Sequence, residues 1–282
     1  MERPSAPGPS RAGRRDVVGL SRRTPLRRLF QTSQIPAGDN SVGVAAEIWY
    51  RLTSGQDPAC VRAWESVLQS DECKRSAEFR SPENRRDYVA AHELLRHAFS
   101  RHQPVLPSAW RFATDANGRP YVSSPPGAAR RAFSLSHTRG LVACALAPGT
   151  QIGVDAEHID SVTDVRSLAA RYYSRPEVAI LEKYPDEVAR VRFIELWTLK
   201  EAIGKALGIG LSLPLNATTF VLSDDGTIAF TPPPAIATGL WDFTIIAPTP
   251  GTRIAAAVRR RDGTRTHFDV RPMTDSLHTH GE

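Results

Sequence analysis

Two short segments carry charged side chains in patterns that suit chemistry at a phosphate group. The first is Gly153-Val154-Asp155-Ala156-Glu157. On a β-strand, alternate side chains share a face, so Asp155 and Glu157 would point the same way and their neighbours would point into the core. Two such carboxylates repel each other unless a cation or a proton intervenes. A hard cation with oxygen ligands, Mg²⁺ before others, would relieve the repulsion; the alternative is an ordinary solvent-facing strand.

The second segment runs from Trp197 to Lys205, with the sequence WTLKEAIGK. On a helix, Trp197, Glu201 and Lys205 fall at positions i, i+4 and i+8 and form one stripe, with Lys200 beside it. We expect Glu201 to complete a metal shell and Lys205 to neutralise a phosphate; the alternative is a surface Glu–Lys pair. Together the segments supply three carboxylates and two lysines, the groups that metal-assisted phosphoryl chemistry requires. These residues alone name no substrate.

Composition and charge restrict the class of protein. The chain has 282 residues, of which 41% are hydrophobic and 23% charged, as in a soluble globular protein. No apolar run approaches the ~20 residues that span a bilayer, and the first thirty residues lack a secretory signal. The three cysteines are widely spaced, which fits a reducing compartment. We therefore expect a cytoplasmic protein with no membrane partner.

The positive charge is confined to the beginning of the chain. Residues 1–30 hold eight arginines and two acidic residues, Glu2 and Asp16. The net charge of this segment, 8 − 2 = +6, equals the net charge of the whole chain. We expect residues 1–43 to be a disordered Arg/Pro-rich tail that the fold does not need. A nucleic-acid-binding or transit-peptide role for the tail is the alternative. The remaining chain has no net charge, which does not favour a nucleic-acid partner.

Periodicity and turn residues predict the order strand, helices, strands, helices, strands. This order indicates an α+β protein of two similar halves joined near residues 148–152. The expected organisation is a tail (1–43), an N-terminal half (44–150), a C-terminal half (151–262) and a C-terminal extension (263–282). The predicted strands are 44–52, 110–114, 131–135, 141–146, 151–157, 218–222, 227–230, 241–246 and 253–258, and the predicted helices are 58–68, 82–101, 162–181 and 186–208.

Both charged segments resemble the signature motifs of the phosphopantetheinyl transferase superfamily. The first has the form G-x-D-x-E and the second the form W-x-x-K-E-x-x-x-K, roughly forty residues apart. Three further stretches resemble the larger, Sfp-type branch: Asn117–Tyr121, Phe133–Thr138 and Gly210–Leu215. The resemblance covers roughly residues 44–260. The length of the chain separates it from the small trimeric acyl-carrier synthases.

This resemblance implies a fold and a reaction. The fold would be a pseudo-twofold pair of α+β halves with the active site in the cleft between them. The enzyme would move 4'-phosphopantetheine from coenzyme A to a serine of an apo acyl or peptidyl carrier protein, leaving adenosine 3',5'-bisphosphate. The carrier would belong to fatty-acid, polyketide or nonribosomal peptide synthesis, and the enzyme would be a monomer.

The resemblance also assigns roles to individual residues. Asp155, Glu157 and Glu201 would hold Mg²⁺, or Mn²⁺ in its place. Glu201 would be the base for the incoming serine, directly or through a water, and Lys205 would stabilise the transferred phosphate. Coenzyme A would contact Arg86, Arg119, Pro120, Ser136, His137, Asp155, Lys200 and Lys205.

Two positions depart from the family pattern or leave a choice open. The family places an arginine for the 3'-phosphate near the start of its long first helix, where this chain has Asp87; a one-residue shift would let Arg86 replace it. The stretch 169–184 is richer in apolar side chains than one helical stripe can bury. Part of it, including Tyr173, would be exposed and would bind the carrier, unless these aromatics pack into the core.

Two other functions are compatible with the charged segments. One is a different Mg²⁺-dependent phosphotransferase or a nuclease that uses the same three carboxylates. The body lacks the net positive charge that such a nuclease would use to hold nucleic acid. The other is an inactive carrier-binding homologue, which would be expected to lack part of the motifs; all five charged motif residues are present.

Overall fold

The computed structural model describes residues 45–115, 119–125, 131–236, 239–261 and 263–274. Every described residue lies in one compact unit, Asn40–Glu282. The expected tail (1–43), the expected turn at Asn117-Gly118 and the end of the expected C-terminal extension lie outside the described residues. The described chain has a mixed α+β fold, as predicted. Within it, no helix is both long and apolar enough to cross a membrane.

The first part of the fold is a mixed sheet with helices and a hairpin. Its sheet has the order β11-β1-β5-β4, antiparallel except where β11 runs parallel to β1. Strand β11 lies in the predicted C-terminal extension, for which no strand was expected. The elements are β1 (Ala45–Leu52), α1 (Pro58–Glu65), α2 (Ser70–Ala77), α3 (Pro82–Ser100), β2 (Arg111–Thr114), β3 (Pro120–Ser124), β4 (Arg131–Thr138), β5 (Leu141–Pro148) and β11 (His267–Pro272).

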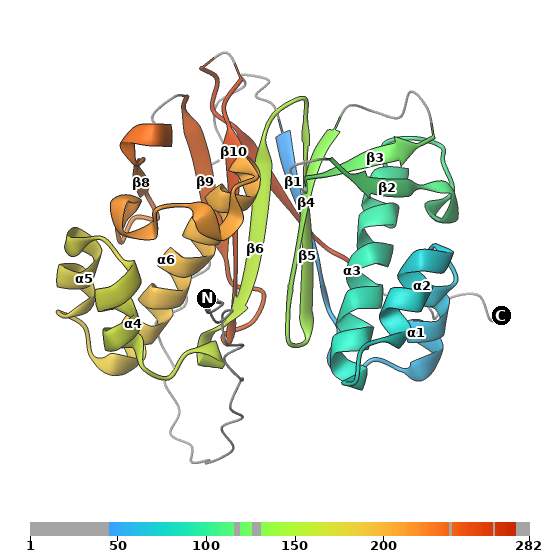
Figure 1. Ribbon diagram of the computed structural model, residues 1–282, viewed down its shortest axis with the longest axis horizontal. Coiled ribbons are helices and arrows are strands. Elements are labelled where there is room, and N and C mark those ends of the chain that lie inside the picture. Colours follow the sequence, from blue (N-terminus) through green and yellow to red (C-terminus); the bar gives the residue numbers. More distant parts are fainter. Residues whose placement is uncertain (1–44, 116–118, 126–130, 237–238, 262, 275–282) are drawn as a thin grey trace, which may run out of the picture. The chain divides into compact units, whose positions relative to one another are not determined.

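The second part of the fold repeats this order of elements. A strand leads into short helices, a long helix and a hairpin, and then two strands return to the sheet. The sheet order β6-β10-β9 corresponds to β1-β5-β4 of the first part (Figure 1). The elements are β6 (Ile152–His158), α4 (Val165–Tyr172), α5 (Arg175–Leu181), α6 (Asp186–Leu207), β7 (Thr219–Leu222), β8 (Ile228–Thr231), β9 (Trp241–Ile246) and β10 (Thr252–Arg259).

The single helix predicted over residues 162–181 is two helices. Tyr173 has an extended backbone, and Ser174 caps the N-terminus of α5 in a capping box with Glu177. Pro176 lies in the first turn of α5, where its missing N–H costs no hydrogen bond. A helix that continued through Pro176 would lose a backbone hydrogen bond and clash with the preceding turn, so the chain starts a new helix.

Small residues allow α6 to lie directly against β6. A Cβ atom at Gly153 would lie 2.0 Å from the carbonyl oxygen of Ala202 and 2.5 Å from the amide of Ala206, both on α6. At Gly204, a Cβ atom would lie 2.8 Å from the carbonyl oxygen of Gly210. The two motif glycines therefore mark places where backbone meets backbone, and α6 is held close to the strand that carries the acidic pair.

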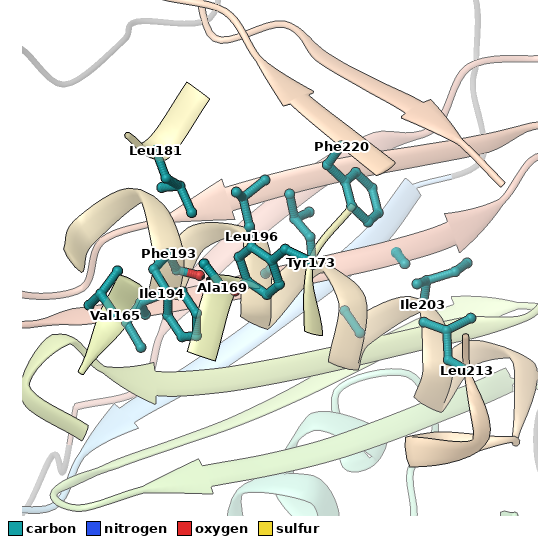
Figure 2. Packing of buried hydrophobic residues seen from close by; sticks show 14 of the residues in the cluster. Val165, Ala169, Tyr173, Leu181, Phe193, Ile194, Leu196, Ile203, Leu213 and Phe220 are labelled. Atoms are coloured by element: carbon teal, nitrogen blue, oxygen red, sulfur yellow. Dashed lines mark hydrogen bonds between the residues drawn. The ribbon is translucent and has the colours of Figure 1, made fainter. Parts of the chain in front are cut away.

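The other face of α6 packs into an aromatic core. The buried residues of this core include Tyr173, Phe193, Leu196 and Phe220 (Figure 2). The ring of Tyr173 stacks on Phe193 with centroids 4.7 Å apart, and its hydroxyl donates a hydrogen bond to the Phe193 carbonyl. This core fixes the rotation of α6 about its axis, because it determines which stripe of the helix remains free.

We predict that Gly153→Ala destabilises the protein by about 1–3 kcal/mol, because the added methyl group forces α6 away from β6. Gly251→Ala is the control, since its Cβ atom would approach only the ring of His158, at 3.3 Å. Chemical unfolding measures both free energies of unfolding. Equal stabilities of the two variants would contradict the close approach of α6 to β6.

Candidate functional site

A pocket of about 390 Å³ opens where β4, β6 and α6 meet. Side chains from all three elements line it, and six of them were predicted site residues. Apolar side chains form the rest of the wall, among them Leu211, which is 75% exposed. The lining residues are Leu135, Ser136, His137, Asp155, Glu157, Trp197, Glu201, Lys205 and Leu211.

The pleat of β6 delivers the acidic pair to this pocket. Val154 and Ala156 are buried in the apolar layer between the two sheets. Asp155 and Glu157 both line the pocket, so the predicted alternation along this strand is confirmed. On α6, Glu201 and Lys205 reach the same pocket one helical turn apart.

Asp155 lies at the centre of a hydrogen-bonded group. Its Oδ1 accepts hydrogen bonds from the Lys205 ammonium at 2.8 Å and from the Ser136 hydroxyl at 2.9 Å. Its Oδ2 is buried and has no hydrogen-bond partner among the described residues. An unpaired buried carboxylate oxygen is costly, and in this pocket a cation is the partner that would satisfy it.

The other two carboxylates respond to this crowding. Burial raises the pKa of Glu157 to about 7, and the neighbouring charges of Asp155 and Glu201 add to the effect, while Lys205 partly opposes it. Burial and the Asp155 charge also raise the pKa of Glu201. Together with Asp155, these two carboxyls with raised pKa values form a set of oxygen donors that suits a hard cation.

The three carboxylates of the pocket could supply part of the coordination shell of Mg²⁺. No three His, Cys, Asp or Glu side chains within the described ranges already form a closed metal site. A cation held by Asp155, Glu157 and Glu201 would take further oxygens from water or from a phosphate. Mg²⁺ commonly binds in this way, through a few carboxylates together with substrate phosphates.

The prediction that Lys200 contacts coenzyme A is wrong. The side chain is fully buried, and its ammonium donates hydrogen bonds to Glu177 at 2.8 Å and to the carbonyl oxygens of Leu215 and Thr218. Successive helical residues point about 100° apart, so Lys200 faces the core while Glu201 faces the pocket. Lys200 is therefore a structural cation that compensates the buried carboxylate of Glu177.

Arg119, Pro120 and Arg86 do not line this pocket. The Arg119 guanidinium donates a hydrogen bond to the carbonyl oxygen of Leu207, the last residue of α6. Pro120 is exposed on β3. Arg86 lines a separate hollow beside the first turns of α1 and α3, together with Arg62 and other residues. Their contacts with coenzyme A stay predictions.

Asp87 has a structural explanation. It is buried, accepts a hydrogen bond from the Thr53 hydroxyl, and accepts another from the Gly140 amide at 3.1 Å. Gly140 lies between β4 and β5, so Asp87 ties α3 to the turn that follows His137. Its carboxylate accepts from these two neutral donors, and the Arg86 guanidinium lies 3.7 Å from its Oδ1.

His137 is exposed on the pocket side of this turn. Its pKa is lowered, mainly because protein atoms displace water from around the ring, and the Lys205 charge adds to the effect. A neutral imidazole can exchange hydrogen bonds with a phosphate but brings no positive charge to it. The cationic group in this pocket is therefore Lys205 rather than His137.

The prediction that Tyr173 is exposed is also wrong. It is 3% exposed, and it packs within the aromatic core under α4 and α5 (Figure 2). The alternative that these aromatics belong to the core therefore holds for Tyr173. The basic residues of the stretch, Arg171, Arg175 and Lys183, are exposed.

Sequence reasoning missed the apolar wall of the pocket. Leu135 directly precedes the pocket-lining residues Ser136 and His137 on β4, and Leu211 lies in the turn after α6. Leu211 carried a signal, because it is flanked by glycine and serine in a stretch too short to bury it. The hydrogen bond from the Val154 amide to the Ser134 hydroxyl was not predicted either.

Comparison with known proteins agrees with this geometry. The family model of the 4'-phosphopantetheinyl transferase superfamily matches residues 151–258, which hold both motifs. The transferase HetI of Nostoc sp. is 30% identical over 185 residues, covering 65% of this chain and 78% of the relative. The chain belongs to the 4'-phosphopantetheinyl transferase superfamily. The transferase Sfp of Bacillus subtilis strain 168 is 33% identical over 175 residues, covering 57% and 75%. A second transferase from Bacillus subtilis is 29% identical over 179 residues, covering 63% and 75%.

Membership of this superfamily confirms the resemblance drawn from the motifs. The matched region begins just before Gly153 and ends on β10, so it spans the complete second part of the fold. In this member of the superfamily, the motif carboxylates meet in the pocket between β4, β6 and α6.

We predict that Glu157→Gln raises the melting temperature of the metal-free transferase at about pH 8. The folded-state pKa of about 7 exceeds the ordinary 4.5, so wild-type stability falls as the pH rises from about 4.5 through 7. The glutamine mimics the protonated form of Glu157. The difference in melting temperature between the variant and the wild type should therefore narrow toward about pH 4.5. Thermal unfolding in EDTA measures it, with the exposed Glu182→Gln as the control. A pH-independent difference would contradict the raised pKa.

Proposed function

We propose that this enzyme transfers the 4'-phosphopantetheine group of coenzyme A to a serine hydroxyl of an apo carrier protein, with Mg²⁺ in the pocket described above. The observation that carries the proposal is the meeting of Asp155, Glu157, Glu201 and Lys205 in one pocket, where Asp155 Oδ2 has no hydrogen-bond partner from the described part of the chain. The names of the relatives support the substrate and the type of reaction.

The reaction breaks the phosphoanhydride bond of the pyrophosphate and forms a phosphate ester bond to serine. The serine oxygen forms a bond to the phosphorus next to the pantetheine arm, and the bond from that phosphorus to the bridging pyrophosphate oxygen breaks. Adenosine 3',5'-bisphosphate leaves with the bridging oxygen. The cation, when bound, neutralises pyrophosphate charge and polarises the phosphoryl group.

Glu201 is the candidate for the serine proton. Its raised pKa makes it a better base than an ordinary surface carboxylate. It lies one helical turn from Lys205, so the base and the phosphate-binding cation project from the same rigid helix. Glu201 therefore has two proposed roles, one toward the metal and one toward the proton, directly or through a water.

Lys205 is the candidate for stabilising the transferred phosphate. Its ammonium bonds Asp155 and the Ser136 hydroxyl, yet the side chain keeps 29% of its surface exposed toward the pocket. A phosphate entering the pocket would meet this charge within a wall that also holds His137. The stabilising charge is in place before the substrate arrives, and such preorganisation favours the transition state.

The repeated order of elements supports two halves related by a pseudo-twofold axis, with the nucleotide end of coenzyme A toward the first half. Arg86, Arg119, Pro120 and His137 all belong to that half. The exposed Arg171, Arg175 and Lys183 of the second half would supply positive charge to an acidic carrier protein. We infer that the enzyme acts as a monomer, because a single chain brings together the three carboxylates and Lys205 that the proposed reaction needs.

Asp155→Asn should lower the turnover number at least about 100-fold, because the amide removes the charge that faces the cation. Asp160→Asn, an exposed acid just after β6, should leave turnover close to wild type. Mass spectrometry of the carrier protein over time gives both rates, and circular dichroism checks the folding of each variant. Transfer by Asp155→Asn at the wild-type rate would refute the assigned role.

Arg86→Ala should weaken coenzyme A binding by about tenfold or more, the effect of one lost charge-assisted hydrogen bond, and should barely affect 3'-dephospho-coenzyme A. Arg85→Ala is the matched control, because Arg85 lines the same hollow and is held by Glu65 at 2.7 Å, whereas the Arg86 guanidinium lies 3.7 Å from its carboxylate neighbour Asp87. Calorimetric titration measures both ligands. Equal weakening for both ligands would mean that Arg86 does not read the 3'-phosphate.

A further inference from the structure

The edges of the two sheets meet along β4 and β6. Among the described residues, each is the outermost strand of its sheet, and the two strands are in contact. Strand β6 pairs with β10 on one side only, so alternate amides of β6 point away from its own sheet. Val154 and Ala156 are buried here, and a buried amide without an acceptor would be costly.

Two serines of β4 supply the acceptors. The Val154 amide donates to the Ser134 hydroxyl at 3.1 Å, and the Ala156 amide donates to the Ser136 hydroxyl at 3.2 Å. The two bonds are in step, two residues apart on each strand. Serine hydroxyls therefore take the place of the carbonyl oxygens that a continuous sheet would offer, and they fix the register of β6 against β4.

Ser136 makes two further contacts that Ser134 does not share. Its hydroxyl donates to Asp155 Oδ1 at 2.9 Å and accepts from the Lys205 ammonium at 2.9 Å. A hydroxyl has one proton to donate and two lone pairs. With Ala156 and Lys205 as donors and Asp155 as acceptor, the hydrogen-bonding capacity of Ser136 is complete, and none remains for a phosphate.

We propose that Ser136 is a positioning residue for Asp155 and not a ligand of coenzyme A. By holding Oδ1, it turns the unpartnered Oδ2 toward the cation, while Ser134 and Ser136 together set the spacing of β4 and β6. This inference rests on the metal site of the proposed function. It identifies Ser134 as a matched control, since both serines accept a β6 amide and only Ser136 touches the carboxylate.

The test is a titration of the metal-free protein with Mn²⁺, in which the electron paramagnetic resonance signal reports free ion. Loss of an outer-shell partner commonly weakens metal binding 10–100-fold. Ser136→Ala should therefore bind Mn²⁺ at least tenfold more weakly than wild type, and Ser134→Ala should stay within about twofold. Both variants should show a lower melting temperature. Ser136→Thr, which keeps the hydroxyl, should restore most of the affinity.

Each other outcome has a definite meaning. A wild type that does not bind Mn²⁺ overturns the metal site, and with it this inference. A wild type that binds while Ser136→Ala binds equally well overturns this inference alone, and a selective loss of coenzyme A affinity in that variant would make Ser136 a ligand. Equal weakening of Mn²⁺ binding in both alanine variants would overturn the specific role of Ser136, because both serines would then act only by setting the spacing of β4 and β6. Should Ser136→Ala fail to fold, Ser136→Cys, a weak hydrogen-bonding group of similar size, is titrated against the same controls.

Discussion

The carboxylate of Asp155 receives hydrogen bonds from two other elements, the ammonium of Lys205 on α6 and the hydroxyl of Ser136 on β4. Through these bonds it joins a strand of one sheet, the edge strand of the other sheet and the long helix of the second part. The remaining oxygen has no partner among the described residues. Oδ1 of Asp155 thus connects β4, β6 and α6, while Oδ2 remains available. The chemistry proposed for this pocket depends on Oδ2.

Close approach of backbones makes this arrangement attainable. Gly153 and Gly204 lie where β6 meets α6 and where α6 meets the following turn, and no side chain fits at either place. The buried pair of Lys200 and Glu177 and the aromatic core around Phe193 hold the opposite side of α6. A charged pair buried this deeply is costly to break, so the helix resists rotation and Glu201 and Lys205 keep their direction.

Much of the site could be predicted because local periodicity governs it. Alternation on β6 puts Asp155 and Glu157 on one side of the strand, and the i, i+4 spacing on α6 puts Glu201 and Lys205 on one side of the helix. The resemblance to the superfamily motifs then assigned both pairs to one site. Lys200 could not be resolved in this way, because its partner Glu177 is distant in sequence and a lysine beside a motif glutamate looks like a second phosphate ligand. Tyr173 was misassigned for a similar reason, since composition alone does not reveal that two short helices and α6 enclose it.

Long-range pairing limited the prediction of the fold. Strand β11 is exposed along much of its length and forms because β1 offers it a parallel edge, an effect without a local signal. The serine contacts between β4 and β6 likewise appear only when two sheet edges meet, although polar residues at alternate positions of an otherwise apolar strand are a readable sign of them. The order of the halves was nevertheless predictable, because each is built from elements that follow one another in sequence.

Intact-mass measurement of an apo carrier protein, incubated with the wild-type enzyme and coenzyme A, tests the central claim most directly. With Mg²⁺ present, the carrier should gain the mass of one phosphopantetheine group on its serine, and an equimolar amount of adenosine 3',5'-bisphosphate should appear. With EDTA in place of the metal, neither product should form. An unmodified carrier in the presence of Mg²⁺, or release of the nucleotide without modification of the carrier, would contradict the account.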